Sequence, residues 1–491
     1  MIFAKNGKNH EIHFMNELEK AEILRHFRSD NPWWTTPRIP TYFADLSPRP
    51  YLSPFLEIVL QEDFHRSVVL LGPRRVGKTV LLHHTIQQLL LRQVAGNRIL
   101  YISLETRAYR TLNLEQLLIW YLEETDQSET RCYVIFDEVQ YQPEWEVDLK
   151  SLTDRYRHIQ FIVSGSAAAA LVSRSRESGA GRFTEFKLPP LTFHEYLTLK
   201  GLLQQVRAVE RTWKDRTLTT YAARNVQELN THFINYLNYG GYPETAVRLR
   251  EGEQATRYLG ADVVGKAIAR DIPILYGISN VNELERLFAT LTYNTGNEVN
   301  LEVLSRDAGL SKPTLTKYLD FLEESFLIKR IHRVDITGKR FKQIRNVKIY
   351  VTNPTLYAAM FLPVRSEDHQ RMGQLVETAI VTQWYHRPQR IAFARWNYAR
   401  GKSQEVDIVG LYRDTLKPSF AVEAKWSNRP IEKPSELVGL VAFAKKNKLD
   451  RVILTTIDQS GTMELEGVTV EYLPAAVYCY TVGRRSFEET R

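Results

Sequence analysis

Short apolar runs alternate with amphipathic stretches in the first half of the chain. Four runs, bounded by polar or glycine residues, predict buried strands at 68–71, 98–105, 131–140 and 159–166. Residues 78–91 have the periodicity of a helix. Because buried strands alternate with helices, we expect a parallel sheet with helices on both faces.

The middle of the chain changes to helical periodicity. Residues 193–280 are predicted to be mainly helical, with a break at "NYGGYPE". Within 299–331, a first helix ends at a tight turn that contains Gly309, and Ser311 is well placed as the N-cap of a second helix. This order predicts a helix-turn-helix.

Strand patterns return after the second of these helices. "LIKRIHRV" and "NVKIYVTN" predict two strands of a wing, with a basic loop at 338–345 between them. Further on, 373–386 is an amphipathic helix. The segments 403–414 and 420–426, joined by "TLKPS", predict a hairpin whose strands pair in one sheet.

Composition narrows the class of protein. Of the 491 residues, 43% are hydrophobic and 11% aromatic, which is enough to fill packed cores and excludes wholesale disorder. The net charge of +8 fits contact with nucleic acid or anionic lipid, and it equally fits charge that only keeps the protein soluble. Two distant cysteines argue against a disulfide framework or a cysteine-based zinc site. The chain has no signal-peptide pattern and no long apolar run, so we expect a cytoplasmic protein without a membrane span.

The first candidate site is a glycine loop between the run at 68–71 and the helix at 78–91. It matches the phosphate-binding pattern of two glycines with four residues between them, followed by lysine and threonine. Its backbone N–H groups would face phosphate oxygens, its lysine would reach the β- and γ-phosphates, and its threonine hydroxyl would bind Mg²⁺. The predicted nucleotide-binding residues are Gly72, Pro73, Arg74, Arg75, Val76, Gly77, Lys78 and Thr79.

Two acids follow the run at 131–140 and complete an ATP site. Asp137 would hold the Mg²⁺ together with Thr79, and Glu138 would act as general base on the attacking water. Ser164 would sense the γ-phosphate, or it simply caps its strand.

An arginine that stabilises the transferring charge is expected in such an enzyme. The sequence does not rank the candidates, and Arg182 is retained among the predicted site residues. The candidates are Arg174, Arg176, Arg182 and Arg270.

A second candidate site lies in the C-terminal part. Glu423 and Lys425, in "AVEAKW", alternate onto one face of a strand. Asp407 lies on the preceding strand, and Glu377 lies on the helix at 373–386. The carboxylates, with Asp407 and Glu423 as ligands, would hold Mg²⁺ or Mn²⁺ and polarise a phosphodiester, while the lysine orients a water. The alternatives are an ordinary surface ion pair or a nuclease fold that has lost its activity.

The helix-turn-helix and the wing supply candidate DNA contacts, with the helix in the major groove and the wing on the backbone. A domain used only for packing or oligomer contacts is the alternative. The predicted contact residues are Lys312, Thr314, Lys317, Tyr318, Lys339 and Arg340.

With these motifs in order, the chain from about residue 65 to residue 491 resembles a family of bacterial and archaeal AAA-type ATPases with a C-terminal restriction-endonuclease-like (PD-(D/E)xK) domain. The resemblance rests on "GPRRVGKT", "YVIFDEVQ", "IVSGSAAAAL", "GRFTEFKLPPLTFHEY", "YGGYPE", "KIYVTNPTLYAA", "GQLVETAIV", "EVDIV" and "AVEAKW". It implies an α/β fold with a P-loop AAA-type parallel-sheet core, a helical lid, a winged helix and a nuclease-like α/β domain. It also implies ATP and Mg²⁺ binding at the glycine loop and a nuclease-like core at the C-terminal acids.

The expected domains are an aromatic- and proline-rich arm (1–66), the ATPase core (67–192), the lid (193–280), the winged helix (281–352) and the nuclease-like domain (353–491). The arm is either an extended segment that lies on the core or on a neighbouring subunit, or a loop buried against its own core.

Three functions follow. The first is an ATP-gated, Mg²⁺-dependent nuclease that acts on DNA, with homo-oligomerisation left open. The second is an ATP-driven switch that binds DNA or a protein through an inactive nuclease-like domain. The third is a protein-remodelling ATPase without a nucleic-acid role.

Overall fold

The computed structural model describes residues 3–61, 65–127, 130–165, 181–213, 216–247, 252–273, 278, 280–340, 345–387, 389–399 and 402–488. The chain divides into two compact units. The first comprises Met1–Gly72 with Gly77–Leu188, and the second comprises Pro73–Val76 with Pro189–Arg491. The boundaries predicted after residues 280 and 352 therefore both fall inside the second unit.

The first unit is built on a five-stranded parallel sheet in its described part, with the strand order β2-β3-β4-β1-β5. Four of the strands are the predicted ones, and β5 was not predicted. β1 to β4 are almost wholly buried, which explains why they are nearly continuous apolar runs. The strands are β1 (Ser67–Leu71), β2 (Ile99–Ser103), β3 (Cys132–Asp137), β4 (Ile159–Gly165) and β5 (Phe183–Lys187).

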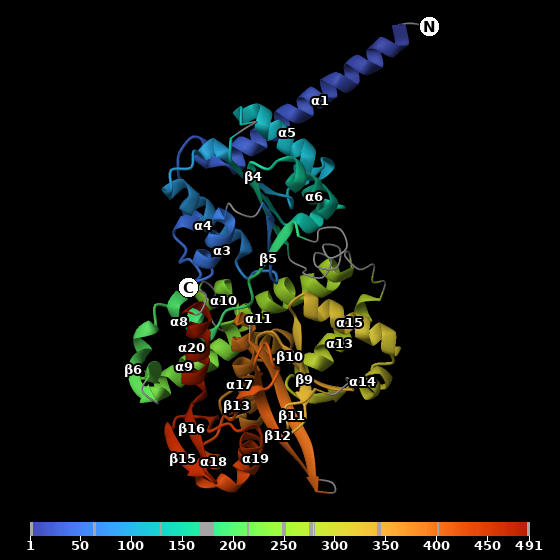
Figure 1. Cartoon of the computed structure of the whole chain (residues 1–491). Coiled ribbons are helices and arrows are strands. Elements are labelled where there is room, and N and C mark those ends of the chain that lie inside the picture. The colour runs from blue at the N-terminus through green and yellow to red at the C-terminus, as the bar shows by residue number, and fades with distance from the viewer. Residues whose placement is uncertain are drawn as a thin grey trace. The chain divides into compact units, whose positions relative to one another are not determined.

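Helices cover both faces of this sheet, as expected for parallel strands. Figure 1 shows α3 and α4 on one side of it and α5 and α6 on the other. The predicted helix over 78–91 is confirmed as α4. The helices are α3 (Leu52–Leu60), α4 (Lys78–Leu91), α5 (Leu114–Thr125) and α6 (Trp145–Arg155).

The N-terminal segment is helical, so the prediction of an extended arm is wrong. It forms α1 (Phe3–Asp30), a 3₁₀ turn (Pro32–Trp34) and α2 (Thr41–Ala44). The indole N–H groups of Trp33 and Trp34 both donate to the carbonyl of Ile99, at 3.0 and 2.9 Å. These contacts tie the segment to strand β2, in agreement with the prediction that it is buried against its own core.

The second unit begins with helices and one hairpin. The hairpin, β6 (Val206–Trp213) paired antiparallel with β7 (Arg216–Ala223), was not predicted, although most of the region between residues 193 and 280 is helical, as expected. Its strands are rich in β-branched valine and threonine, which favour a pleated conformation. The helices are α8 (Phe193–Leu199), α9 (Val226–Tyr239), α10 (Pro243–Val247) and α11 (Glu253–Tyr258), followed by π-helical turns at Leu259–Gly265 and Ala267–Asp271. The break predicted at "NYGGYPE" is confirmed between α9 and α10.

The predicted helix-turn-helix is present as α14 and α15. Gly309 adopts a φ of 67° in the turn, and the Ser311 hydroxyl accepts a hydrogen bond from the N–H of Thr314 at 3.2 Å, as an N-cap does. The surrounding elements are α13 (Val281–Tyr293), β8 (Glu298–Asn300), α14 (Leu301–Asp307), α15 (Lys312–Glu324), β9 (Ile328–Val334) and β10 (Asn346–Val351).

A nine-stranded sheet runs through the described part of the second unit, in the order β15-β16-β14-β13-β12-β11-β9-β10-β8. The predicted hairpin is confirmed, with Ile408 opposite Val422. β9 also pairs in parallel with β11, so the strands of the predicted wing and those of the predicted nuclease-like domain belong to one sheet. The remaining strands are β11 (Arg390–Ala399), β12 (Lys402–Leu411), β13 (Pro418–Glu423), β14 (Arg451–Thr456), β15 (Gly461–Leu465) and β16 (Val468–Pro474).

Two long C-terminal helices pack with α9 against one face of this sheet. α17 (His369–Gln383) buries Leu375, Val376 and Ile380 in a cluster that also contains Val422 of β13. α20 (Ala475–Glu488) joins the same cluster, whereas α19 (Val438–Asn447) packs against strand residues of a separate one. Short helices lie at α16 (Thr355–Met360) and α18 (Arg429–Glu432). In the part of the chain that the structure describes, no helix has the length and apolarity needed to cross a membrane.

Candidate functional site

The glycine loop follows the carboxyl end of β1 and leads directly into α4. Gly77 has a φ of 95° and Arg75 a φ of 63°, so the loop turns through two left-handed residues before the helix begins. Lys78 is buried, and its Nζ donates to the carbonyl of Gly72 at 3.1 Å, across the loop. The loop therefore has the strand–turn–helix setting that a phosphate-binding loop requires.

Asp137 lies at the end of β3 beside the loop. Its Oδ2 accepts hydrogen bonds from the Thr79 hydroxyl and the Tyr101 hydroxyl, both at 2.8 Å, and its Oδ1 accepts one from the Ser164 hydroxyl. The two side chains predicted to hold Mg²⁺ are thus in direct contact, and oxygen donors of this kind suit that ion. The sheet order explains the contact with Ser164, because β4 lies between β1 and β3.

Glu138 is the first residue after β3 and has a left-handed backbone with a φ of 60°. Its backbone N–H donates to Asp137 Oδ1 at 3.1 Å and faces the Ser164 hydroxyl at 3.4 Å. Its carboxylate accepts a hydrogen bond from the side chain of Gln140. Asp137, Glu138 and Ser164 therefore meet at one sheet edge, as the sequence predicted.

The middle of the loop, residues 73–76, groups with the second unit. There Arg75 donates to Asp262 at 3.0 Å and lies over the ring of Tyr258, 5.3 Å from its centroid. Pro73 and Val76 are buried and Arg74 is partly buried.

The structure contradicts the choice of Arg182 as part of this chain's own ATP site. Arg182 precedes β5, whose first residue pairs with Ser67 at the start of β1, whereas the glycine loop follows the end of β1. Arg182 is thus at the opposite edge of the sheet, where it forms an exposed ion pair with Asp154 at 2.8 Å. Its place before an unpredicted parallel strand could not be read from the sequence. Arg174 and Arg176 lie outside the described residues, as does the side chain of Arg270.

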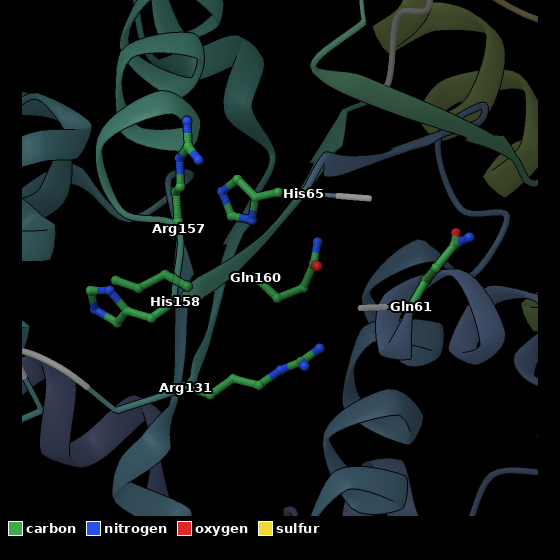
Figure 2. A pocket seen from close by; sticks show the side chains of 7 residues that line it. Gln61, His65, Arg131, Arg157, His158 and Gln160 are labelled. Carbon is green, nitrogen blue, oxygen red and sulfur yellow. The ribbon is translucent and has the colours of Figure 1, made fainter. Parts of the chain in front are cut away.

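A pocket of about 150 Å³ also lies at that opposite edge. Figure 2 shows the side chains around it, which come from the amino ends of β1, β3 and β4 and include Arg131, Arg157 and His65. The pocket is therefore separate from the glycine loop and forms no part of the nucleotide site.

The four residues predicted for the C-terminal site come together in the second unit. The register of β12 and β13 places Asp407 beside the end of β13, and the backbone N–H of Ala424 donates to Asp407 Oδ2 at 2.9 Å. The Lys425 ammonium donates to Asp407 at 3.1 Å and to Glu423 at 2.7 Å. Thr455 bonds to both the N–H and the carbonyl of Lys425, which fixes the chain just beyond the strand.

A second lysine, which the sequence analysis missed, enters the same site from β10. The Lys348 ammonium lies 2.9 Å from Glu377, 2.6 Å from Glu405 and 3.5 Å from Asp407. Tyr350, two residues along the same strand, donates its hydroxyl to Glu377 at 2.7 Å. A lysine and a tyrosine on one face of the apolar run "NVKIYVTN" were the signal that could have revealed them. We call Glu377, Glu405, Asp407, Glu423, Lys348 and Lys425 the carboxylate cluster.

Burial and mutual charge set the protonation of this cluster. Burial, reinforced by the nearby Asp407, raises the pKa of Glu423 to about 7. Burial also raises the pKa of Glu377. Burial alone would raise the pKa of Asp407, but Lys425 and Lys348 outweigh it and hold that pKa below its usual value. Asp407 therefore stays charged more readily than Glu377 or Glu423.

The carboxylate oxygens fit a hard divalent cation, although they face the two ammonium groups more than one another. Glu423 Oε2 is buried and has no hydrogen-bond partner among the described residues, which leaves an oxygen open to a ligand. Within the described part of the chain, no three histidine, cysteine, aspartate or glutamate side chains gather closely enough to hold a metal ion by themselves. A site of two carboxylates, Asp407 and Glu423, still suits Mg²⁺, which usually keeps several waters and is completed by substrate phosphates.

The predicted DNA-contact residues are exposed except for two. Lys312 and Lys317 are exposed at the start of α15, and Lys339 and Arg340 are exposed after β9. Tyr318 is only 7% exposed, so its prediction as a surface contact is wrong. With Leu315, Leu319 and Leu322 it completes the apolar stripe of α15 at helical spacing, and this stripe faces the core.

The second exception is Thr314. It is partly buried, and its hydroxyl bonds with the Ser311 hydroxyl in the N-cap at 2.8 Å.

Comparison with known proteins identifies two matching families. Residues 64–197 match the AAA domain, and residues 230–368 match a domain of unknown function called DUF8612. An uncharacterised protein of Haemophilus influenzae is 26% identical over 294 residues, covering 58% of this chain and 66% of the relative. An uncharacterised protein of Methanocaldococcus jannaschii is 24% identical over 326 residues, covering 65% of each. The chain thus spans just under two thirds of the length of both relatives.

The similarity of this chain to solved structures is low. An S. cerevisiae Hsp104–casein complex matches with 15% identity over 61% of this chain and 59% of that one, at a TM-score of 0.29. An S. cerevisiae Hsp104–ADP complex matches with 15% identity over 57% of this chain and 39% of that one, at a TM-score of 0.29.

The family match and the geometry agree on the first unit. The AAA match covers all five strands of its parallel sheet, the glycine loop and the contact between Thr79 and Asp137. Residues 64–197 of the chain therefore form an AAA domain.

Proposed function

We propose that this protein hydrolyses ATP and couples it to a Mg²⁺-dependent nuclease that acts on DNA. The observation that carries the proposal is the convergence of Glu377, Asp407, Glu423 and Lys425 within one cluster. These residues come from α17, β12, β13 and the segment just after β13. Acids and a lysine in this arrangement are suited to hydrolysis of a phosphodiester.

The glycine loop would hold the ATP phosphates, with Lys78 reaching the β- and γ-phosphates. Thr79 and Asp137 would hold Mg²⁺. Glu138 would act on the attacking water, and Ser164 would sense the γ-phosphate through its contact with Asp137.

In the second unit, Asp407 and Glu423 would hold the cation. When bound, Mg²⁺ or Mn²⁺ polarises the scissile phosphate and lowers the pKa of a bound water. Lys425 would offset charge on the phosphate and orient the water. Glu377 would support the arrangement from α17 through its bonds to Lys348 and Tyr350.

DNA would be held by the segment from α13 to β10, which has the element order of a winged helix. Lys312 and Lys317 on α15 face solvent, and the exposed Lys339 and Arg340 lie between β9 and β10. Exposed cations of this kind neutralise phosphates and position the duplex.

A specific observation favours a second candidate function, an ATP-driven switch whose cluster does not cut. Two ammonium groups already offset part of the charge of four carboxylates. In that case the second unit is a platform for DNA or a protein partner.

Cleavage of supercoiled plasmid distinguishes the two. Purified protein is incubated with Mg²⁺ or Mn²⁺, with and without ATP, beside Glu423→Ala. The control is Glu436→Ala, which removes an exposed glutamate paired with Arg429 on the surface. We expect metal-dependent nicking by the wild type and the control that Glu423→Ala lacks. Equal absence of nicking in all three would overturn the nuclease proposal in favour of the switch.

A further inference from the structure

We propose that Lys348 is the resident counter-cation of the carboxylate cluster and that it limits how tightly the cluster binds a divalent cation. The inference rests on the proposed nuclease function because it concerns the regulation of the same site.

Carboxylates surround Lys348, which donates a hydrogen bond to Glu377 and forms ion pairs with Glu405 and Asp407. An ammonium group has three N–H donors, and three carboxylates surround this one, those of Glu377, Glu405 and Asp407. The ammonium also lies over the ring of Phe393, 5.5 Å from its centroid. The side chain is 5% exposed, so water does not replace these partners. Lys348 is thus held at a fixed place inside the cluster.

The electrostatic balance keeps this lysine charged. The carboxylates of Glu377 and Glu405 lie 2.9 and 2.6 Å from its ammonium group, and opposite charges this close favour the charged form of a lysine. A positive charge is therefore built into the cluster in the absence of any metal.

Asp407 is the residue at which this charge and a divalent cation compete. Its Oδ1 faces Lys348 and its Oδ2 faces Lys425, so both oxygens of the predicted ligand contact an ammonium group. On the other predicted ligand, Glu423 Oε2 has no hydrogen-bond partner among the described residues. A cation that enters beside Glu423 and binds Asp407 must share an oxygen with Lys348, at Oδ1, or with Lys425, at Oδ2, and the positive charge of Lys348 weakens its binding in either case.

Lys348 comes from outside the segment predicted to be nuclease-like. It lies on β10, between β9 and β8, two residues after the start of a strand assigned to the wing. The continuous sheet is what carries it to residues 377–423. The cation-binding strength of the cluster is therefore set jointly by two segments that the sequence pattern treats as separate domains.

Direct Mn²⁺ binding to the nucleotide-free full chain tests the inference, with free Mn²⁺ measured by electron paramagnetic resonance. Lys348→Gln removes the charge and keeps an amide donor for one carboxylate. We expect it to bind Mn²⁺ roughly tenfold more tightly than the wild type, because one positive charge has left the site. The control is Lys445→Gln, which breaks the surface pair with Glu466 and should leave affinity unchanged.

Two further variants identify the site that gains affinity. Lys348→Arg keeps the charge and should bind Mn²⁺ as weakly as the wild type. Adding Asp407→Asn to Lys348→Gln should remove the gain. Unchanged or weaker Mn²⁺ binding by a folded Lys348→Gln would overturn the inference.

Should Lys348→Gln fail to fold, the wild type provides the test. The Lys348 side-chain NMR signal must shift as Mg²⁺ saturates the cluster, and a signal that does not move would also overturn the inference.

Failure of this inference and failure of the nuclease proposal give different results. Tighter Mn²⁺ binding by Lys348→Gln without any plasmid cleavage supports the role of Lys348 and removes the nuclease. Plasmid cleavage by the wild type, together with equal Mn²⁺ affinities of the wild type and Lys348→Gln, supports the nuclease and excludes the proposed role of Lys348.

Discussion

The glycine-loop site and the carboxylate cluster both centre on an aspartate at a strand of a sheet, yet their donors differ. Asp137 accepts hydrogen bonds from the hydroxyls of Thr79, Tyr101 and Ser164. Asp407 instead contacts the ammonium groups of Lys348 and Lys425.

Neutral donors orient a carboxylate and leave its negative charge in place, whereas ammonium groups orient it and also offset that charge. The first site is therefore prepared for a cation that arrives with the nucleotide. The second site carries cations of its own, and any metal must compete with them. Aspartate thus stands in two different electrostatic settings, one open to a cation and one already neutralised in part.

The largest effect is expected at the glycine loop. Lys78→Ala removes the cation that would stabilise the phosphates, so we expect ATP hydrolysis to fall by roughly a hundredfold or more. Phosphate release and binding of a fluorescent ATP analogue measure this. The control is Arg92→Ala, at the other end of the same helix, which should be unaffected. Lys78→Ala protein that binds ATP as well as the wild type would show that the assigned site is wrong.

The second largest effect is expected on stability, which should fall more at the carboxylate cluster than at Asp137. Lys348→Met leaves three carboxylates without their shared cation, so we expect the free energy of unfolding of the second unit to fall by about 3–5 kcal/mol. Asp137→Asn keeps an oxygen acceptor for the hydroxyls and should change the stability of the first unit by about 1 kcal/mol or less. Urea unfolding of the full chain, with a probe in each unit, measures both. Equal losses of unfolding free energy in the two variants would show that the two aspartate environments do not differ in this way.

His194 is a buried base with no carboxylate partner among the residues that the structure describes. His194 is 9% exposed, and burial, aided by the nearby Arg484, lowers its pKa to about 4. Between pH 4 and the unfolded value near 6.5 the unfolded chain binds more protons, so the contribution of neutral His194 to stability is complete above that range and is lost as the pH falls through it.

Replacing this histidine isolates its share of the acid sensitivity. At pH 4.5 we expect His194→Phe to retain about 2 kcal/mol more unfolding free energy than the wild type, relative to their difference at pH 7. Urea unfolding at the two pH values measures it. Identical pH dependence in both proteins would contradict the assignment.

The smallest effect is expected at the exposed face of α15. Lys312→Ala should lower the slope of log affinity against log salt for DNA by about 0.9, because one phosphate contact is lost. Tyr318→Phe is the matched change on the buried face and should leave the slope unaltered. Fluorescence anisotropy with a labelled duplex at several salt concentrations measures both. Absence of salt-dependent DNA binding would favour the protein-remodelling function.

Local patterns predicted most of the elements that carry the sites. The glycine loop, the helix after it and the hairpin of β12 and β13 depend on backbone geometry and periodicity, which neighbouring residues control. The exposure of Tyr318 was mispredicted although Leu315, Leu319 and Leu322 mark the buried stripe. The strands β6 and β7 were missed because a short polar hairpin has a weak pattern.

By itself, the sequence determined which residue types stand at the strand ends and which local elements hold them. Only the tertiary structure decided which side chains meet. Sheet order placed Arg182 at the edge opposite the glycine loop, and the parallel pairing of β9 with β11 extended the sheet so that Lys348 reaches Glu377 and Asp407. Strand pairing is a long-range choice among many apolar partners, so its consequences for charge are not contained in any local stretch.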